Sequence, residues 1–260
     1  MRSTLRTRSL IAMSIHTSAS SIYDAALTLL YPQACTVCGS SVEHRADGVA
    51  CATCWEETRT FGRDALMCWK CGTPAPGKVP DDKRQTVRCH RCDSEHFTAA
   101  RACGAYEGAL RASVLSLKSE PYVPTRLAHL IFETQQLEPL SSATRIMSVP
   151  LHSDRLRERG FNQAAILGRA LAGLANLPLD ESSLVRTAHT ERHRAGMDAR
   201  GRRESVEKAF EVRYPRMVQG ERILLIDDVF TSGATVSACA NVLIAAGAQS
   251  VYVLTIARAI

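Results

Sequence analysis

The residues best able to do chemistry lie in the run 223–235, where an apolar stretch meets two carboxylates and a hydroxyl- and glycine-rich turn. Residues 223–226 are all aliphatic, which predicts a buried strand. Asp227 and Asp228 follow directly, and apolar side chains at helical spacing run from Val236 until Gly247. The run therefore predicts a strand, a short loop and the N-terminus of a helix.

Such a loop suits a phosphate group. Amides at a helix N-terminus have no intrahelical partners, and the helix dipole adds positive potential there. Gly233 lets the backbone approach an anion closely, and the hydroxyls of Thr231, Ser232 and Thr235 can donate to it. Carboxylates at the end of a strand, where open α/β sheets bind ligands, suit the vicinal hydroxyls of a ribose. The alternative is a capped strand–helix turn with two solvated aspartates.

This run resembles the signature of the type I phosphoribosyltransferases, in which an apolar strand and two acidic residues precede Thr-Thr-Gly-x-Thr. Ser232 stands for the second Thr and keeps its hydroxyl. The resemblance implies that Asp227 and Asp228 are catalytic and hold the ribose hydroxyls of phosphoribosyl pyrophosphate (PRPP), with Mg²⁺. It implies that the loop holds the 5′-phosphate through Thr231, Ser232, Gly233, Ala234 and Thr235. A P-loop or a dinucleotide site is a poor alternative, because neither glycine motif is present.

Eight of the ten cysteines form four Cys-x-x-Cys pairs, which predicts metal binding. Two such pairs supply the four thiolates of a tetrahedral zinc site. We expect two structural zinc ions, each held by neighbouring pairs, although crossed pairing of the cysteines is also open. The expected ligands are Cys35, Cys38, Cys51, Cys54, Cys68, Cys71, Cys89 and Cys92.

Three other uses of these cysteines compete with zinc. Disulfides need an oxidising compartment, and no secretory signal is visible. Redox Cys-x-x-Cys motifs usually come singly, and an iron–sulfur cluster is less consistent with ribbon-like pairing. Zinc can supply on the order of 10 kcal/mol of folding free energy. That contribution matters here, because the polar stretches 39–50 and 72–88 have little core of their own.

Composition excludes some classes of protein. The chain has 260 residues, 45% of them hydrophobic and 5% aromatic, so a buried core is feasible and extensive base stacking is not expected. The net charge of +6 favours phosphate-bearing partners. No apolar run approaches the roughly 20 residues of a membrane helix, and we expect a cytoplasmic protein. The first residues lack acids and are rich in Arg and Ser, which fits a disordered basic tail, a transit peptide or a start at Met13.

Beyond the cysteines, strand and helix patterns alternate. Helical spacing begins near Leu110, in 126–137 and after Phe161, whereas 146–151 and 251–256 are expected strands. This alternation predicts an α/β fold with a mainly parallel sheet flanked by helices. We expect a tail over 1–30, a double zinc ribbon over 31–98 and a phosphoribosyltransferase-like domain over 99–260.

The two halves together resemble the ComF competence-protein family, also described as amidophosphoribosyltransferase-like. The resemblance rests on the cysteine pairs, Leu117-Lys118, the strand ending at 149–151, the Arg-Gly-Phe-Asn-Gln run at 159–163 and the acidic loop. It implies a link to the uptake of single-stranded DNA in natural transformation. The family's Gln and Asn in a later segment are Arg194 and Ser205 here, which affects any acceptor recognition by that segment.

Several cations can bind the pyrophosphate of PRPP. Arg159, beside a glycine turn, and Lys118 are the expected PRPP ligands. Asn162 and Gln163 can bond a substrate or cap their own helix. Further candidates are Arg155, Arg194 and Arg202.

Two functions from different classes follow from these observations. The first is a phosphoribosyltransferase that uses PRPP. The second is a single-stranded-DNA-handling or adaptor protein of the competence machinery, with a regulatory or vestigial PRPP site and a helicase-like partner. The sequence does not decide whether the chain is an enzyme, because a fold alone does not fix a function.

Overall fold

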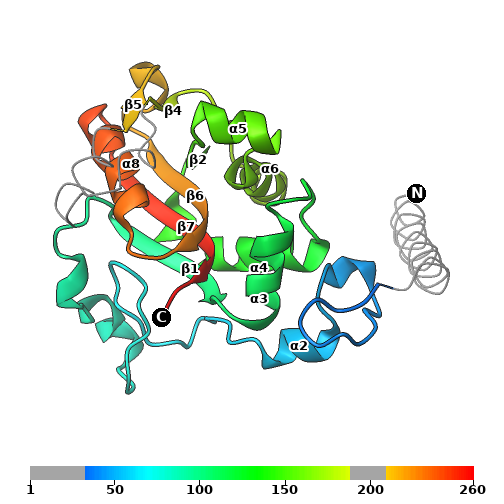
Figure 1. Cartoon of the computed structure of the whole chain (residues 1–260). Helices are drawn as coiled ribbons and strands as arrows, with labels where there is room; N and C mark the ends of the chain where they lie inside the picture. The colour runs from blue at the N-terminus through cyan, green and yellow to red at the C-terminus, as the bar shows by residue number, and fades with distance from the viewer. Residues whose placement is uncertain (1–32, 188–208) are drawn as a thin grey trace, which may run out of the picture.

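The computed structural model describes residues 33–187 and 209–260, and its centre is a five-stranded parallel sheet (Figure 1). A short antiparallel pair, β4 with β5, lies outside this sheet. The mainly parallel sheet is therefore confirmed. In sheet order the strands are β1 (Ala99–Ala105), β7 (Ser250–Arg258), β6 (Arg222–Phe230), β2 (Arg145–Ser148) and β3 (Leu179–Asp180), and the pair is β4 (Leu184–Arg186) and β5 (Phe210–Val212).

Helices cover both faces of the sheet, as Figure 1 shows. On one face lie α3 (Gly108–Ser116), α4 (Thr125–Gln135) and α6 (Gln163–Ala175), and on the other lies α8 (Ala234–Ala245). The remaining helical segments are α2 (Ala52–Glu57), α5 (Ser153–Arg159), η1 (Arg45–Asp47), η2 (Asp81–Thr86), η3 (His90–Cys92), η4 (Leu140–Ser142) and η5 (Pro215–Met217). In this part of the chain no helix is both long and apolar enough to cross a membrane.

The continuous apolar run in β6 is explained by burial on both faces. Leu224 and Ile226 pack in the core with α4 and α6, whereas Ile223 and Leu225 pack in the core with α8. Side chains alternate between the faces of a strand, so a strand covered on both sides favours an apolar side chain at every position. This double burial fixes β6 at the centre of the molecule.

Three elements differ from the sequence-based expectation. The strand β1 was missed because it is rich in Ala and Gly, which rarely form strands, yet every residue in it is buried. The helix α5 was missed because it buries no residue and so shows no apolar periodicity. The strand β2 ends at Ser148, before Pro150, although we expected it to continue to residue 151.

The cysteine-rich region shares its core with the sheet. Cys35, Cys51 and Cys54 are buried in the same cluster as residues of α3 and α4. The Arg126 guanidinium of α4 forms an ion pair with Asp47 at 3.0 Å. It also stacks on a tryptophan of α2, at 5.0 Å from the ring. The predicted division at 98/99 stays a prediction, and the predicted tail 1–30 lies outside the described residues.

The segment that joins the two cysteine groups covers the outer edge of β1. The Phe61 amide donates to the Cys103 carbonyl oxygen at 2.8 Å, and the Ala105 amide donates to Arg59 at 2.9 Å. These bonds satisfy backbone groups that an edge strand would otherwise expose. The approach is so close at Gly104 that a Cβ atom there would lie 2.4 Å from the Arg59 carbonyl oxygen.

Gly104→Ala is therefore expected to destabilise the protein. The added methyl group must displace backbone or Leu110, and overpacking of this kind costs about 1–3 kcal/mol. Gly173→Ala is the control, since Gly173 lies in α6 with open space around it and Ala favours a helix by up to about 1 kcal/mol. Urea unfolding of both variants measures the difference. Equal stability of the two variants would contradict the close packing at β1.

Candidate functional site

The acidic pair lies inside β6, three residues before the strand ends at Phe230. The strand continues because β7 pairs with it as far as Phe230 opposite Arg258. On its other side, β2 stops at Ser148, opposite Ile226. We expected Asp227 and Asp228 to follow the strand, and this detail was wrong. The pair instead lies on a strand that has lost one neighbour, where the edge of β6 is open.

The run at 159–163 connects to this pair through hydrogen bonds. The Gln163 side-chain amide donates to the Asp228 carboxylate at 3.1 Å, and the Arg159 guanidinium donates to the Gln163 amide oxygen. Asn162 has a different role, because its side chain accepts from the Ala164 amide at 3.0 Å and caps α6. Asn162 thus takes the capping role, one of the two expected for these amides, whereas Gln163 binds the acidic pair, a role that the sequence did not indicate.

The charge state of Asp227 is perturbed. Burial and the neighbouring Asp228 charge raise the pKa of Asp227 to about 8. Arg186, in β4, acts in the opposite direction and lowers the pKa of Asp227. The sequence did not single out Arg186, because it lies far from Asp227 in the chain and only the fold brings the two together. Such a shift, beside a specific charged partner, is typical of functional sites.

The predicted phosphate loop has the expected backbone. Gly233 has φ +83° and is the N-cap residue of α8, which begins at Ala234. A Cβ atom at Gly233 would lie 2.8 Å from the Phe230 ring, so both the backbone angle and the space require glycine. Thr231 and Ser232 are exposed, as groups that meet a ligand must be.

The predicted cationic ligands differ in whether they contact the site. Arg159 joins the acidic pair through Gln163, as described above. In the ranges that the structure covers, Lys118 is exposed after α3 and forms no hydrogen bond or ion pair with the loop or the acidic pair. Arg155 lies in α5. Arg194 and Arg202 lie outside the described residues.

A cavity of about 760 Å³ borders the site. It lies between the ends of β2, α5 and α6 on one side and β4 on the other, and its lining includes Ser148, Asn162 and Arg186. Ser148 pairs with Ile226, Asn162 directly precedes Gln163, and Arg186 lowers the pKa of Asp227, although neither aspartate is in the lining. The cavity is thus a candidate compartment for a second reactant beside the acidic pair.

The eight paired cysteines form two groups of four. Cys35, Cys38, Cys51 and Cys54 form one, and Cys68, Cys71, Cys89 and Cys92 form the other, with all sulfurs of a group within 4.8 Å. The structure therefore brings neighbouring pairs together.

The sulfur positions fit zinc. Four Zn–S bonds of about 2.3 Å in a tetrahedron place sulfurs about 3.8 Å apart. The Sγ–Sγ distances are 3.8 Å for Cys35–Cys54 and 3.6 Å for Cys68–Cys92. The Cys89 amide donates to the Cys68 sulfur at 3.3 Å. Amide bonds of this kind favour the thiolate, which is the form that binds metal.

We expect the purified chain to hold about two zinc equivalents, and Cys68→Ser to hold about one. Because Cys68 packs in the core with α8, the variant should also lower the midpoint of global thermal unfolding. Metal analysis measures the zinc content, and calorimetry measures the midpoint of thermal unfolding. The matched variant is Cys38→Ser, at an exposed cysteine of the other group. Iron–sulfur absorbance, or protein without metal, would contradict this assignment.

The raised pKa of Asp227 predicts a pH-dependent stability. An unfolded aspartate has a pKa of about 3.9. Between that value and about 8 the folded state keeps a proton that the unfolded state has released, so stability falls as the pH rises across this window and the loss is complete above about 8. Asp227→Asn should therefore be more stable than wild type at pH 8.5 and have little effect near pH 4.

Urea unfolding at the two pH values tests this prediction. Asp81→Asn, at an exposed position in η2, is the control and should show no such pH dependence. A gain for Asp227→Asn that is equal at both pH values would show that the carboxyl is not perturbed.

Comparisons with known proteins agree with this architecture. The family model of the double zinc ribbon domain matches residues 26–93. DNA utilization protein YhgH of Escherichia coli O157:H7 is 29% identical over 240 residues, which cover 88% of this chain and 99% of that protein. Competence protein F of Haemophilus influenzae is 29% identical over 143 residues, 53% of this chain and 62% of that protein.

Among solved structures, the glutamine PRPP amidotransferase from B. subtilis, complexed with ADP and GMP, overlaps 57% of this chain and 26% of its own. The overlap has a TM-score of 0.35 and 16% identity. The sequence relatives confirm the resemblance to the ComF competence proteins. The chain is thus a homologue of DNA utilization protein YhgH and competence protein F, with a double zinc ribbon ahead of a mainly parallel α/β sheet.

Proposed function

We propose that this chain binds PRPP with Mg²⁺ and acts as a phosphoribosyltransferase-like protein in the use of incoming DNA. One observation carries the proposal: β6 extends past the end of β2, bears two carboxylates there, and leads into a glycine-capped helix N-terminus. A ribose 5-phosphate needs acceptors for its hydroxyls and amide donors for its phosphate. Asp227 and Asp228 supply the first and the loop 231–235 supplies the second.

The chemistry is a displacement at C1 of the ribose. A nitrogen nucleophile forms a bond to C1, and pyrophosphate leaves with the electrons of the broken C1–O bond. Positive charge develops on the ribose in the transition state, and the Asp228 carboxylate stabilises it, joined by Asp227 when that residue is ionised. Mg²⁺, when bound, neutralises the departing pyrophosphate. The protein mainly positions the reactants, so the reaction needs no side-chain nucleophile.

Arg159 and Gln163 support this role of the acidic pair. The Gln163 amide fixes one oxygen of Asp228, and Arg159 fixes Gln163 in turn. A carboxylate held in this way is prepared for a ribose hydroxyl before the ligand arrives, which lowers the entropic cost of binding. The nitrogen acceptor would enter the cavity of about 760 Å³ beside the pair.

Calorimetric titration of PRPP with Mg²⁺ tests the proposal. Wild type should bind, and Asp227→Asn with Asp228→Asn should lose at least about tenfold in affinity, because the charge-assisted bond of the Asp228 carboxylate alone contributes about 1.5–3 kcal/mol. The matched control is Asp81→Asn with Asp82→Asn, another adjacent acidic pair, which is exposed in η2. Equal affinity of wild type and the site variant, with both folded, would refute the assignment.

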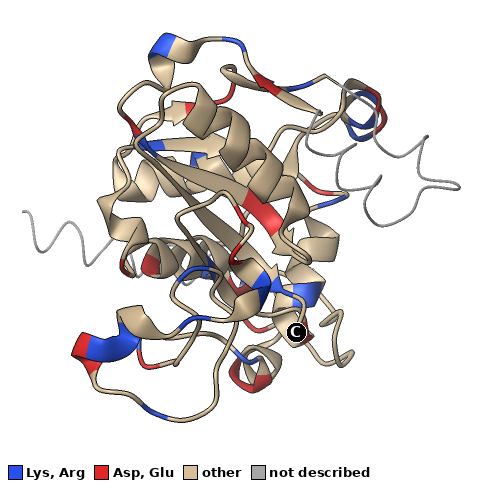
Figure 2. Cartoon of the chain, turned by 90° about the vertical axis from the view of Figure 1, so that its left-hand side faces the viewer, with Lys and Arg blue, Asp and Glu red and all other residues tan. Residues whose placement is uncertain are grey.

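Handling of single-stranded DNA is a second candidate function. The relatives are named for DNA utilization and competence, and the chain carries a net charge of +6. Figure 2 shows Lys and Arg interspersed with Asp and Glu along the described chain in that view. Binding of a labelled oligonucleotide should weaken steeply with salt if phosphate contacts dominate. A helicase-like partner and a cytoplasmic location remain predictions.

A further inference from the structure

Two buried arginines flank the second cysteine group. Arg101 is 4% exposed and Arg258 is 8% exposed, and within residues 33–187 and 209–260 neither forms an ion pair with a carboxylate. Zinc with four thiolates carries two net negative charges. Two guanidinium groups beside it would balance that charge, which otherwise makes burial costly. The metal site therefore accounts for two buried cations that have no acidic partner.

Arg258 also reaches toward the phosphate loop. It ends β7, and its guanidinium donates to the Cys71 carbonyl oxygen and, at 2.6 Å, to the Thr73 hydroxyl. The same group lies over the Phe230 ring, 4.3 Å from its centre. One side chain thus contacts the metal-binding knuckle and the last residue of β6.

Phe230 in turn supports the turn that the ligand would meet. Its ring lies 2.8 Å from the place of a Cβ atom at Gly233, so the loop backbone rests directly on the ring. Phe97, which is 1% exposed, packs against Phe230 edge to face, with the ring centres 5.9 Å apart. Contacts therefore run without a gap from Cys71 through Arg258 and Phe230 to Gly233.

A second contact joins the same ribbon to the helix after the loop. The His96 amide donates to the Ser237 hydroxyl, at 2.9 Å, in the first turn of α8. A cavity of about 250 Å³ lies between the ribbon and the loop, and its lining includes Cys92, Arg258 and Thr231. The ribbon therefore holds both sides of the predicted phosphate cradle.

From these contacts we infer that Arg258 is a positioning residue that makes the phosphate loop depend on metal at the second cysteine group. The identity of the ligand, PRPP, rests on the proposed function. Loss of zinc at Cys68, Cys71, Cys89 and Cys92 releases Arg258, and the Phe230 ring then no longer fixes the loop. PRPP affinity falls although no cysteine touches the ligand.

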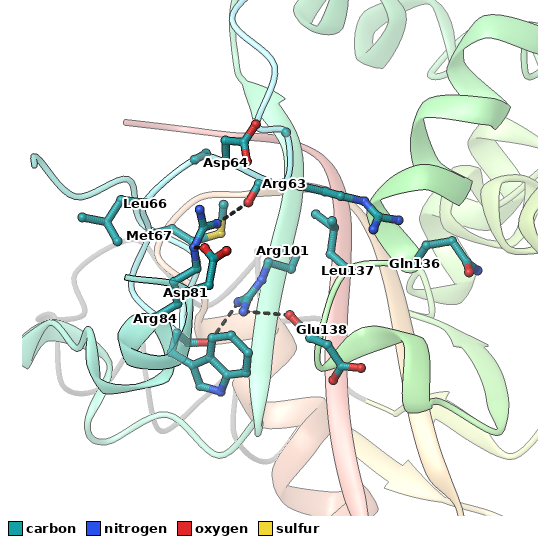
Figure 3. A pocket seen from close by; sticks show the side chains of 13 residues that line it. Arg63, Asp64, Leu66, Met67, Asp81, Arg84, Arg101, Gln136, Leu137 and Glu138 are labelled. Carbon is teal, nitrogen blue, oxygen red and sulfur yellow. Dashed lines mark hydrogen bonds and ion pairs between the residues drawn. The ribbon is translucent and has the colours of Figure 1, made fainter. Parts of the chain in front are cut away.

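Arg101 provides a matched control within the same protein. Its guanidinium donates to the Trp69 carbonyl oxygen at 2.9 Å and to the Glu138 carbonyl oxygen at 3.1 Å, and Figure 3 shows the side chain directed toward Glu138. It stacks on the Trp69 ring at 5.1 Å and lines a separate cavity of about 530 Å³. Arg101 is thus buried like Arg258 and donates to the residue after Cys68, but its described contacts do not include the loop.

The experiment compares Arg258→Gln, Arg258→Lys and Arg101→Gln in the full chain. Zinc release to a chelator, calorimetric PRPP affinity with Mg²⁺, and hydrogen exchange of the ligand-free loop amides are measured. Both Gln variants should release zinc faster. In the zinc-loaded proteins, without chelator, Arg258→Gln should bind PRPP at least about tenfold more weakly and exchange its loop amides faster, whereas Arg101→Gln should match wild type in both. Arg258→Lys keeps the charge but loses the planar guanidinium over Phe230. It should therefore retain zinc but bind PRPP more weakly than wild type.

The outcomes separate this inference from the proposed function. If wild type does not bind PRPP, the proposed function fails, and loop exchange still decides the coupling. Unchanged loop exchange in Arg258→Gln would overturn the inference, as would an equal loss of PRPP affinity in Arg101→Gln. If Arg258→Gln does not fold, Arg258→Lys decides, and wild-type loop exchange and affinity in that variant would overturn the inference.

Discussion

The register between β6 and β7 is the constraint on which the site depends. These strands pair as far as Phe230 opposite Arg258, while β2 ends opposite Ile226. The acidic pair is therefore held rigidly by one neighbour and left open on the other side. The same register brings the Arg258 guanidinium over the Phe230 ring, beside the second cysteine group. A slip of one residue would exchange the faces of all these side chains.

The zinc ribbons are built into the fold rather than appended to it. The first group shares a core with α3 and α4, and the second shares a core with α8 and the inner strands. Residues that lie in one packed core respond together to a change at any of them. Metal content, global stability and the geometry of the loop are therefore expected to vary together, which a free-standing metal module would not require.

The sequence predicted the features that local chemistry determines. The aliphatic run of β6, the glycine at the start of α8 and the cysteine pairs each have a strong local pattern, and the structure contains all three. The extent of β6 beyond Ile226 was not predictable, because it depends on a partner strand far along the chain. β1 and α5 lack a local signal, the first because it is built of small residues and the second because it buries none.

The site shows the same division between local and long-range information. Asp227, Asp228 and the loop are contiguous, so sequence alone places them together. The bond of Gln163 to Asp228 and the influence of Arg186 on Asp227 join residues far apart in the chain. The same is true of the contact of Arg258 with Cys71, which links the last strand to a zinc ribbon. Only the packed structure reveals these connections.

The most direct measurement is a crystal structure of the full chain grown with PRPP and Mg²⁺. The account predicts the 5′-phosphate within hydrogen-bond distance of the backbone amides of 231–235. It predicts the ribose hydroxyls at Asp227 and Asp228, with the pyrophosphate on the side of Arg159. PRPP bound away from β6, or an empty loop at a concentration that saturates the protein in solution, would contradict the central claim.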